Sequence, residues 1–165
     1  MRNCQKQCKV YQKWQNQFNM SEIFSHKTPS ESTGFLLWKV NNLWQREIRK
    51  TLKKYNLTHT QFVVLATTVW LSHKNSDLSQ VEIANQIEID KMMTSNVLRT
   101  LEKNGLLERS EHKTDTRAKT IRPTKKGIGL LEKAVREVED FDNHFFGQLE
   151  NIKGFNNGLN NLLVE

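Results

Sequence analysis

Residues 90–106 read DKMMTSNVLRTLEKNGL. Asp90 is a favoured helix N-cap, and Asn104-Gly105 is a typical helix end, because glycine readily adopts the left-handed backbone found there. Between these two signals the apolar residues recur at the spacing of an α-helix. The pattern predicts a buried side formed by Met93, Val97, Leu98 and Leu101. The opposite side of this helix is polar and is predicted to face solvent.

The segments next to this helix complete a known motif. Before it, Ser79-Gln80-Val81-Glu82 is a capping box, the sequence signature of a helix start, and it opens a short helix. After it come two short extended runs, residues 106–112 and 118–123, joined by the polar segment 113–117. A short helix, a tight turn, a second helix and a β-hairpin, in that order, make a winged helix-turn-helix.

Helices are also predicted on both sides of this motif. Apolar spacings of three and four predict a long amphipathic helix from Phe35 to Tyr55. Thr58-His59-Thr60-Gln61 is a capping box that opens another helix. One face of that helix is predicted to carry Phe62, Leu65, Ala66 and Val69. Thr124 caps a final long helix, whose apolar stripe continues past Gly147. The chain is therefore predicted to be mainly α with a small β-hairpin wing.

The charge is unevenly distributed along the 165 residues. There are 25 Lys and Arg against 18 Asp and Glu, which gives a net charge of +7 and a pI near 9.5. Residues 89–126 hold ten basic and five acidic residues, whereas residues 127–165 hold three and seven. The basic segment is expected to meet a polyanion, and an ordinary mixed surface with a basic excess is the alternative.

Composition also restricts the class of protein. An apolar content of 36% and a mean hydropathy of −0.68 are low for a compact monomer. They favour an elongated helical protein that pairs with a second copy. No apolar run approaches the roughly 20 residues of a membrane span, and no signal peptide is recognised. Two cysteines, Cys4 and Cys8, are too few for a disulfide scaffold, so the reducing cytoplasm is the expected location.

The start of the chain, residues 1–30, is predicted to be a polar, basic tail. Residues 1–19 are rich in Asn and Gln and contain no acidic residue. Met20 then precedes more ordinary sequence, which suggests the hypothesis that translation begins there. In that case residues 1–19 would be an upstream extension.

The polar side of the 90–106 helix is the first candidate site. It is predicted to carry Lys91, Met92, Thr94, Ser95, Asn96, Arg99 and Lys103. A helix fits the major groove of B-DNA, which is about 12 Å wide, and Asn and Arg side chains match the edges of adenine and guanine respectively. The alternative is a solvated helix face whose polar residues have no partner.

The turn of the hairpin is the second candidate site. Arg117 at the tip is placed to enter a narrow minor groove, where the negative potential is strongest. Asp115 can orient the guanidinium of Arg117 by an ion pair. Lys113, Lys119 and Arg122 would add phosphate contacts, which provide affinity without sequence information. A solvated loop of small consequence is the alternative.

From Gly34 to about Phe146 the chain resembles the MarR family of transcriptional regulators. The likeness is carried by residues 58–62 (THTQF), 78–84 (LSQVEIA), 90–106, 115–119 (DTRAK) and 124–127 (TKKG). The resemblance implies an obligate homodimer, formed by the first and last helices, that binds a pseudo-palindromic operator. It also implies that Arg117 enters the minor groove. Members of this family often release DNA when a small phenolic or other ligand enters a cleft between the dimer helices and the DNA-binding lobe.

These expectations divide the chain into functional parts. Residues 34–55 and 125–165 are predicted to form the helical dimerisation region, and residues 57–124 the DNA-binding winged helix-turn-helix lobe. The stripe of the last helix includes Leu131, Val135, Val138 and Phe145. So thin a chain cannot bury this stripe alone, and a twin copy would cover it. Packing on the first helix alone is the alternative.

An effector cleft is also predicted. Phe35, Trp38, His59, Phe62 and Trp70 are candidates to line it, and ordinary core packing is the alternative for these aromatics. Residues 34–38 contain no cysteine, so the peroxide sensing known from one branch of the family is not expected. Lys6 and Lys9 would favour the thiolate forms of Cys4 and Cys8, which are either redox-active or inert tail thiols.

Catalysis and metal binding have no positive signal in the sequence. The five histidines show no pair at helical metal-ligand spacing, and neither a phosphate-binding glycine loop nor a nucleophile elbow is found. The chain is thus predicted to be a regulator without cofactor rather than an enzyme. Two rival functions are a protein-interaction module built on a winged helix, and a DNA binder without sequence preference.

Overall fold

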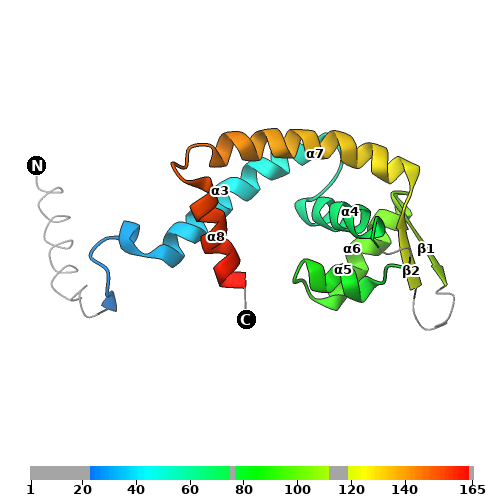
Figure 1. Cartoon of the computed structure of the whole chain (residues 1–165), viewed down its shortest axis with the longest axis horizontal. Helices are drawn as coiled ribbons and strands as arrows, with labels where there is room; N and C mark the ends of the chain where they lie inside the picture. Colours follow the sequence, from blue (N-terminus) through cyan, green and yellow to red (C-terminus); the bar gives the residue numbers. More distant parts are fainter. Residues whose placement is uncertain (1–22, 75–76, 112–118, 164–165) are drawn as a thin grey trace, which may run out of the picture. The chain divides into compact units, whose positions relative to one another are not determined.

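The computed structural model describes residues 23–74, 77–111 and 119–163, and the chain divides into two compact units, the first ending at Leu43 and the second beginning at Trp44. Six α-helices, one 3-10 helix and two strands lie in the described residues (Figure 1). In chain order they are η1 (Pro29–Glu31), α3 (Thr33–Lys53), α4 (His59–Ser72), α5 (Gln80–Gln86), α6 (Lys91–Lys103), β1 (Leu107–Glu111), β2 (Lys119–Pro123), α7 (Lys125–Phe146) and α8 (Ile152–Leu163). The prediction of a mainly α protein with a hairpin wing is confirmed.

The first unit, described from residue 23, holds η1 and the start of α3. None of its described residues is buried. Several large apolar side chains of α3 are 42–62% exposed: Phe35, Leu36, Leu37, Trp38, Val40 and Leu43. A run of exposed apolar side chains on one helix is typical of a surface that another chain covers.

In the second unit, from Trp44 onward, capping hydrogen bonds confirm the predicted helix starts. The Thr58 hydroxyl accepts from the Gln61 amide at 3.2 Å, and the Gln61 side chain accepts from the Thr58 amide at 2.9 Å. Ser79 and Glu82 make the same reciprocal pair at the start of α5. The Asp90 carboxylate accepts from the Met93 amide at 2.8 Å and so caps α6. Such caps satisfy backbone donors that the helix itself leaves unpaired.

Helix α4 lies at the centre of the second unit. It packs against α5, α6, α7 and β2. Figure 1 shows it between α5 and α7. The prediction of a single buried face was too narrow, since Val64 and Thr68 are fully buried beside Phe62 and Leu65. The Thr68 hydroxyl donates to the Val64 carbonyl at 2.7 Å, so its burial leaves no unpaired polar group.

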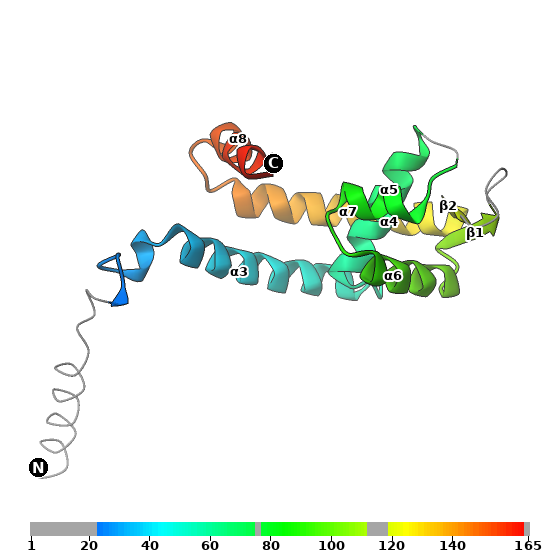
Figure 2. The same cartoon turned by 90° about the horizontal axis from the view of Figure 1, so that it is seen from below.

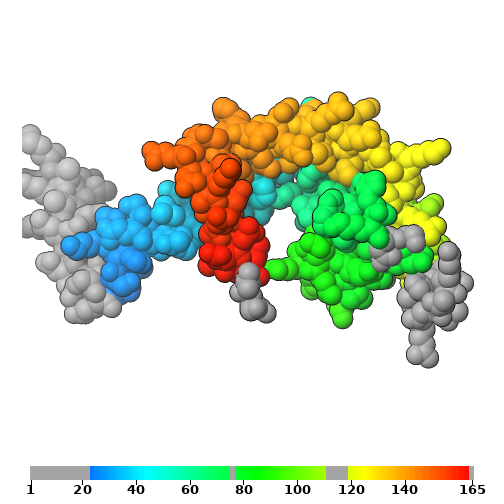
Figure 3. Space-filling model, in the orientation of Figure 1, coloured from blue at the N-terminus to red at the C-terminus, as the bar shows by residue number. Residues whose placement is uncertain are grey.

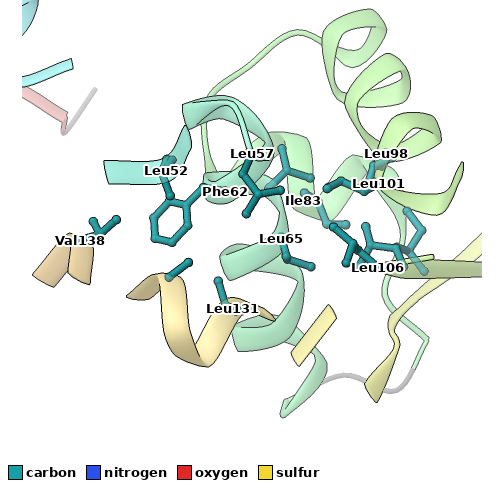
Figure 4. Close-up of a cluster of buried hydrophobic side chains, with 14 of the residues drawn as sticks. Leu52, Leu57, Phe62, Leu65, Ile83, Leu98, Leu101, Leu106, Leu131 and Val138 are labelled. Atoms are coloured by element: carbon teal, nitrogen blue, oxygen red, sulfur yellow. The ribbon is translucent and has the colours of Figure 1, made fainter. Parts of the chain in front are cut away.

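The hydrophobic core forms around α4 (Figure 4). Its members include Ile48 and Leu52 of α3, Phe62 and Leu65 of α4, Ile83 of α5, Leu98 and Leu101 of α6, Ile121 of β2, and Leu131 and Val138 of α7. Burying one such side chain stabilises the fold by about 1.5–3 kcal/mol. The core therefore fixes the positions of α5, α6 and the hairpin relative to α4. Leu131 and Val138 of the last predicted stripe are buried in this core within one chain, because α7 packs against α4, so the prediction that only a twin copy could cover them is wrong.

The wing is a two-stranded antiparallel sheet with Leu107 opposite Pro123 and Glu111 opposite Lys119. A further bridge joins Thr120 of β2 to Ser79, and the Ile121 amide donates to the Leu78 carbonyl at 2.8 Å. Strand β2 is thus attached to the residues that lead into α5.

A close backbone approach joins the end of α6 to the start of α7. Gly105 has φ +70°, the left-handed conformation predicted for it. The Thr124 hydroxyl donates to the Gly105 carbonyl at 2.7 Å and accepts from the Gly127 amide at 3.0 Å. The first turn of α7 passes so near that a Cβ on Gly127 would collide with the carbonyl oxygen of Leu106.

We expect Gly127→Ala to lower the free energy of unfolding by about 1–3 kcal/mol, because the added methyl meets backbone that cannot rotate away. Urea denaturation followed by circular dichroism measures this. Gly129→Ala is the matched control, since nothing lies within 4 Å of a Cβ there and alanine favours a helix over glycine. Equal stability of the two variants would contradict the prediction.

Candidate nucleic-acid interface

The helix predicted to read DNA, α6, is held in place from its inner side and from its start. Leu98 and Leu101 are fully buried in the core. At the first turn, the Gln80 side-chain amide of α5 donates to the Lys91 carbonyl at 3.0 Å. In Figure 2, α6 lies along the lower edge of the lobe that it forms with α4, α5 and the hairpin. A rigidly held helix loses little conformational entropy when it docks.

The outer side of α6 is polar and open. Lys91, Met92, Asn96, Arg99 and Lys103 are exposed and Ser95 is half-buried. Met92 is 75% exposed, which leaves its thioether free to contact a ligand. These six residues, which we call the α6 outer face, are six of the seven that the sequence predicted to contact DNA; the seventh is Thr94.

Two details of the α6 prediction are wrong. Thr94, predicted to contact DNA, is fully buried, and its hydroxyl donates to the Asp90 carbonyl at 2.9 Å. Met93, predicted to be buried, is 48% exposed. A threonine whose hydroxyl bonds within its own helix can be buried at little cost, so the core accepts the smaller side chain. The inner stripe is therefore centred on Thr94, Leu98 and Leu101.

Only the outer residues of the predicted wing site lie in the described part of the chain. Lys113, Asp115 and Arg117 lie outside the described residues. Lys119, the first residue of β2, is exposed. The Arg122 guanidinium lies 3.5 Å from the Asp77 carboxylate, and 44% of its side chain is exposed.

The chemistry of the α6 outer face suits a nucleic acid. Asn96 and Arg99 lie about one helical turn apart; the asparagine amide can donate and accept at a base edge, and the arginine guanidinium can donate two hydrogen bonds there. Lysines at both ends of the helix can approach phosphates on either side of a groove.

Comparison with known proteins identifies the family. The profile of the ArnR1-like winged-helix domain matches residues 53–140. The HTH-type transcriptional regulator YdcH of Bacillus subtilis, itself uncharacterized, is 36% identical over 135 residues, which are 82% of this chain and 92% of YdcH. The chain belongs to the MarR family of winged-helix transcriptional regulators.

Solved structures of MarR-family proteins have the same fold. MepR of Staphylococcus aureus, solved in complex with DNA, superposes with a TM-score of 0.73 at 25% identity, over 80% of this chain and 96% of MepR. MarR of Escherichia coli, solved without ligand, gives 0.64 at 21% identity, over 81% and 98%. Since the family consists of regulators, the prediction that this chain is not an enzyme agrees with its membership.

The five residues predicted to line an effector cleft in this MarR-family chain do not share one environment. In the first unit, Phe35 and Trp38 stack with ring centroids 6.2 Å apart. In the second unit, Phe62 belongs to the core, His59 is half-buried and Trp70 is 53% exposed, with the Lys74 ammonium 4.1 Å from its ring centroid. His59 and Phe62 do not line the groove that Trp70 borders.

That groove is an open, mostly apolar hollow of about 580 Å³ between α4, α5 and α7. Its lining consists of Ala66, Thr67, Val69, Trp70, His73, Gln86, Ile87, Leu131 and Val135. The volume is in the range of small-molecule sites. Sequence reasoning found Trp70 but missed the others, because they come together only when three helices pack.

A second cluster that sequence reasoning missed surrounds His59. The His59 and Trp44 rings pack edge-on, with their centroids 5.0 Å apart. The Trp44 indole N–H donates to the Asp142 carboxylate at 2.7 Å. Burial lowers the pKa of His59 below its usual 6.5, Asp142 acts in the opposite direction and Arg49 adds to the lowering. The folded protein therefore favours neutral His59.

This shift predicts a pH dependence of stability. The unfolded chain takes up the proton first as pH falls, so the free energy of unfolding should decrease below the unfolded pKa of about 6.5. We expect His59→Gln to make the decrease between pH 7.5 and pH 5.5 smaller, as measured by urea denaturation. His144→Gln, which removes an exposed histidine of α7, is the control. A His59→Gln profile identical to that of the unmodified protein would contradict the assignment.

Residues 23–74, 77–111 and 119–163 contain no helix of the length and apolar character that a membrane span requires. Within the same residues, no three His, Cys, Asp or Glu side chains gather in a way that could hold a metal ion.

Proposed function

We propose that this MarR-family regulator is a homodimeric repressor that binds a specific double-stranded DNA sequence. The observation that carries the proposal is the α6 outer face: Asn96 and Arg99 are exposed on a helix whose other side is buried in the core. An exposed, rigidly held pair of base-reading side chains is what sequence-specific major-groove recognition requires.

The other charged residues would orient the protein on the duplex. Lys91 and Lys103 at the two ends of α6, and Lys119 on β2, are exposed and can approach phosphates. The proposal also includes Lys113, Asp115 and Arg117 in the roles predicted from the sequence, with Arg117 in the minor groove. Phosphate contacts of this kind make binding depend strongly on salt.

Pairing of two copies is supported by the exposed apolar residues of α8. No residue of α8 is buried, yet Ile152, Phe155, Leu159 and Leu162 follow helical spacing and are 36–78% exposed. Figure 3 shows α8 (red) uncovered on the face presented there. A two-fold dimer would present two α6 helices about 34 Å apart, one turn of DNA, and so would prefer inverted half-sites.

Release by a small molecule is the last part of the proposal. The groove beside Trp70 is apolar, and it contains the end of α5, from which the chain leads directly into α6. An aromatic ligand wedged there would shift α5 and α6 away from α4. Trp70→Ala, which removes an exposed aromatic side chain from the groove lining, should leave DNA binding intact and weaken release by any ligand found in a screen of aromatic acids and phenols. Unchanged release would remove the groove from the proposal.

The central test is binding to DNA recovered from a randomised duplex library. A specific regulator should bind the recovered sequence about 10³-fold or more tightly than a scrambled duplex, at two salt concentrations. A salt-sensitive protein without this preference would be an architectural binder. A protein that binds neither duplex would be an interaction module, and the proposal would be wrong.

A further inference from the structure

The strand that follows the α6 helix carries an arginine pointing back to it. The Arg109 side chain of β1 is only 12% exposed, although a guanidinium is charged. Its Nε lies 3.2 Å from the Glu102 carboxylate, and its Nη2 donates to the Ser95 carbonyl at 3.3 Å. Both partners belong to α6, one in the middle of the helix and one in the last turn.

A nearly buried guanidinium is costly unless its surroundings supply acceptors. Here the Glu102 carboxylate supplies an opposite charge at ion-pair distance, and the Ser95 carbonyl accepts a hydrogen bond from the Arg109 Nη2. The planar, branched head group lets one side chain hold two points of α6 at once. Arg109 is thus a bridge between the helix and the hairpin.

Arg109 belongs to a series of contacts that begins and ends at α6. Arg109 pairs with Ile121 across the sheet, and the Ile121 amide donates to the Leu78 carbonyl. Two residues later, the Gln80 side chain donates to the Lys91 carbonyl at the start of α6. These contacts run from Ser95 of α6 through both strands of the wing and back to Lys91 of α6. Removing the Arg109 side chain breaks the contact between α6 and β1.

We propose that Arg109 is a positioning residue for DNA sequence selection, fixing the angle between α6 and the hairpin through Ser95 and Glu102. The inference rests on the proposed function. Base reading by α6 requires placement within a fraction of an ångström, whereas phosphate contacts tolerate displacement. Loss of the bridge should therefore reduce discrimination between sequences more than it reduces overall affinity.

The experiment compares Arg109→Gln with the unmodified protein on two duplexes. These are the sequence that the unmodified protein recovers from a randomised library, and a scrambled version of it. We expect the ratio of the two Kd values to fall about ten-fold or more, with the affinity for the scrambled duplex changed less than about three-fold. Arg109→Lys, which keeps the charge but loses the second contact, should retain part of the ratio. Glu102→Gln should lie between Arg109→Gln and the unmodified protein.

Arg136→Gln is the matched control, since it removes an exposed arginine of α7 and changes the net charge equally. A purely structural role for Arg109 would lower the folded fraction and reduce both affinities by the same factor. An unchanged ratio in folded Arg109→Gln would overturn the inference, as would equal losses on both duplexes. If Arg109→Gln does not fold, as judged by circular dichroism, the same readout on Arg109→Lys and Glu102→Gln decides. An unmodified protein without any sequence preference would instead refute the proposed function.

Discussion

Arg99→Ala is expected to weaken binding to the recovered operator by about 1–3 kcal/mol, roughly 5- to 150-fold, and to relax the preference for one guanine in each half-site. The reason is the position of Arg99 on the exposed side of α6, where nothing in the core depends on it. Fluorescence anisotropy with operators substituted at single positions measures both effects. Asn96→Ala should act in the same way on a different base, an adenine.

The control for Arg99→Ala is Arg136→Ala, which removes the same side chain from the exposed surface of α7. It should change affinity for operator and scrambled duplexes little and equally. Arg117→Ala, by contrast, should weaken binding to all sequences if it makes the minor-groove contact predicted for it. Equal losses on every duplex for Arg99→Ala and Asn96→Ala would show that neither reads a base.

The second large effect is expected from α8. Placing two glutamates on its apolar side, by Leu159→Glu and Leu162→Glu together, should convert the protein to a monomer at micromolar concentration. Burying these carboxylates in an interface costs several kcal/mol per group. Operator affinity should then fall about 100-fold or more, since two half-sites no longer act together. Light scattering and anisotropy measure the two consequences.

Asn157→Glu with Asn161→Glu is the matched control, because it adds the same two charges to the opposite, polar side of α8. That variant should remain a dimer and bind operator normally. The assignment of α8 to the interface fails if the leucine variant is still dimeric, and also if it binds operator fully as a monomer.

Much of the second unit could be predicted because its signals are local. Thr58, Ser79, Asp90 and Thr124 each satisfy the first amides of their own helix, and such caps are formed by residues three or four positions apart. Gly105 ends α6 through its own backbone conformation. Contacts between residues so close in the chain can be predicted from the sequence alone.

The predictions that were wrong concern burial, which depends on tertiary packing. Met93 and Thr94 both fit a helix, and only contact with the core decided that Thr94 is buried. Helix α4 was assigned one buried face because periodicity describes a helix at a surface, whereas this helix is surrounded by four elements. The predicted aromatic cleft failed to include the residues of the groove beside Trp70 for a related reason. Residues on three separate helices share no sequence signal.

What the sequence by itself determined is the order of the elements, their start and end points, the wing and the polar identity of the α6 outer face. Short-range hydrogen bonds and a simple periodicity are sufficient for all of these. Tertiary structure alone decided that Thr94 rather than Met93 is buried, how Arg109 joins α6 to the hairpin, and that His59 contacts Trp44. These contacts join residues distant in the chain, so their geometry exists only after the core has assembled.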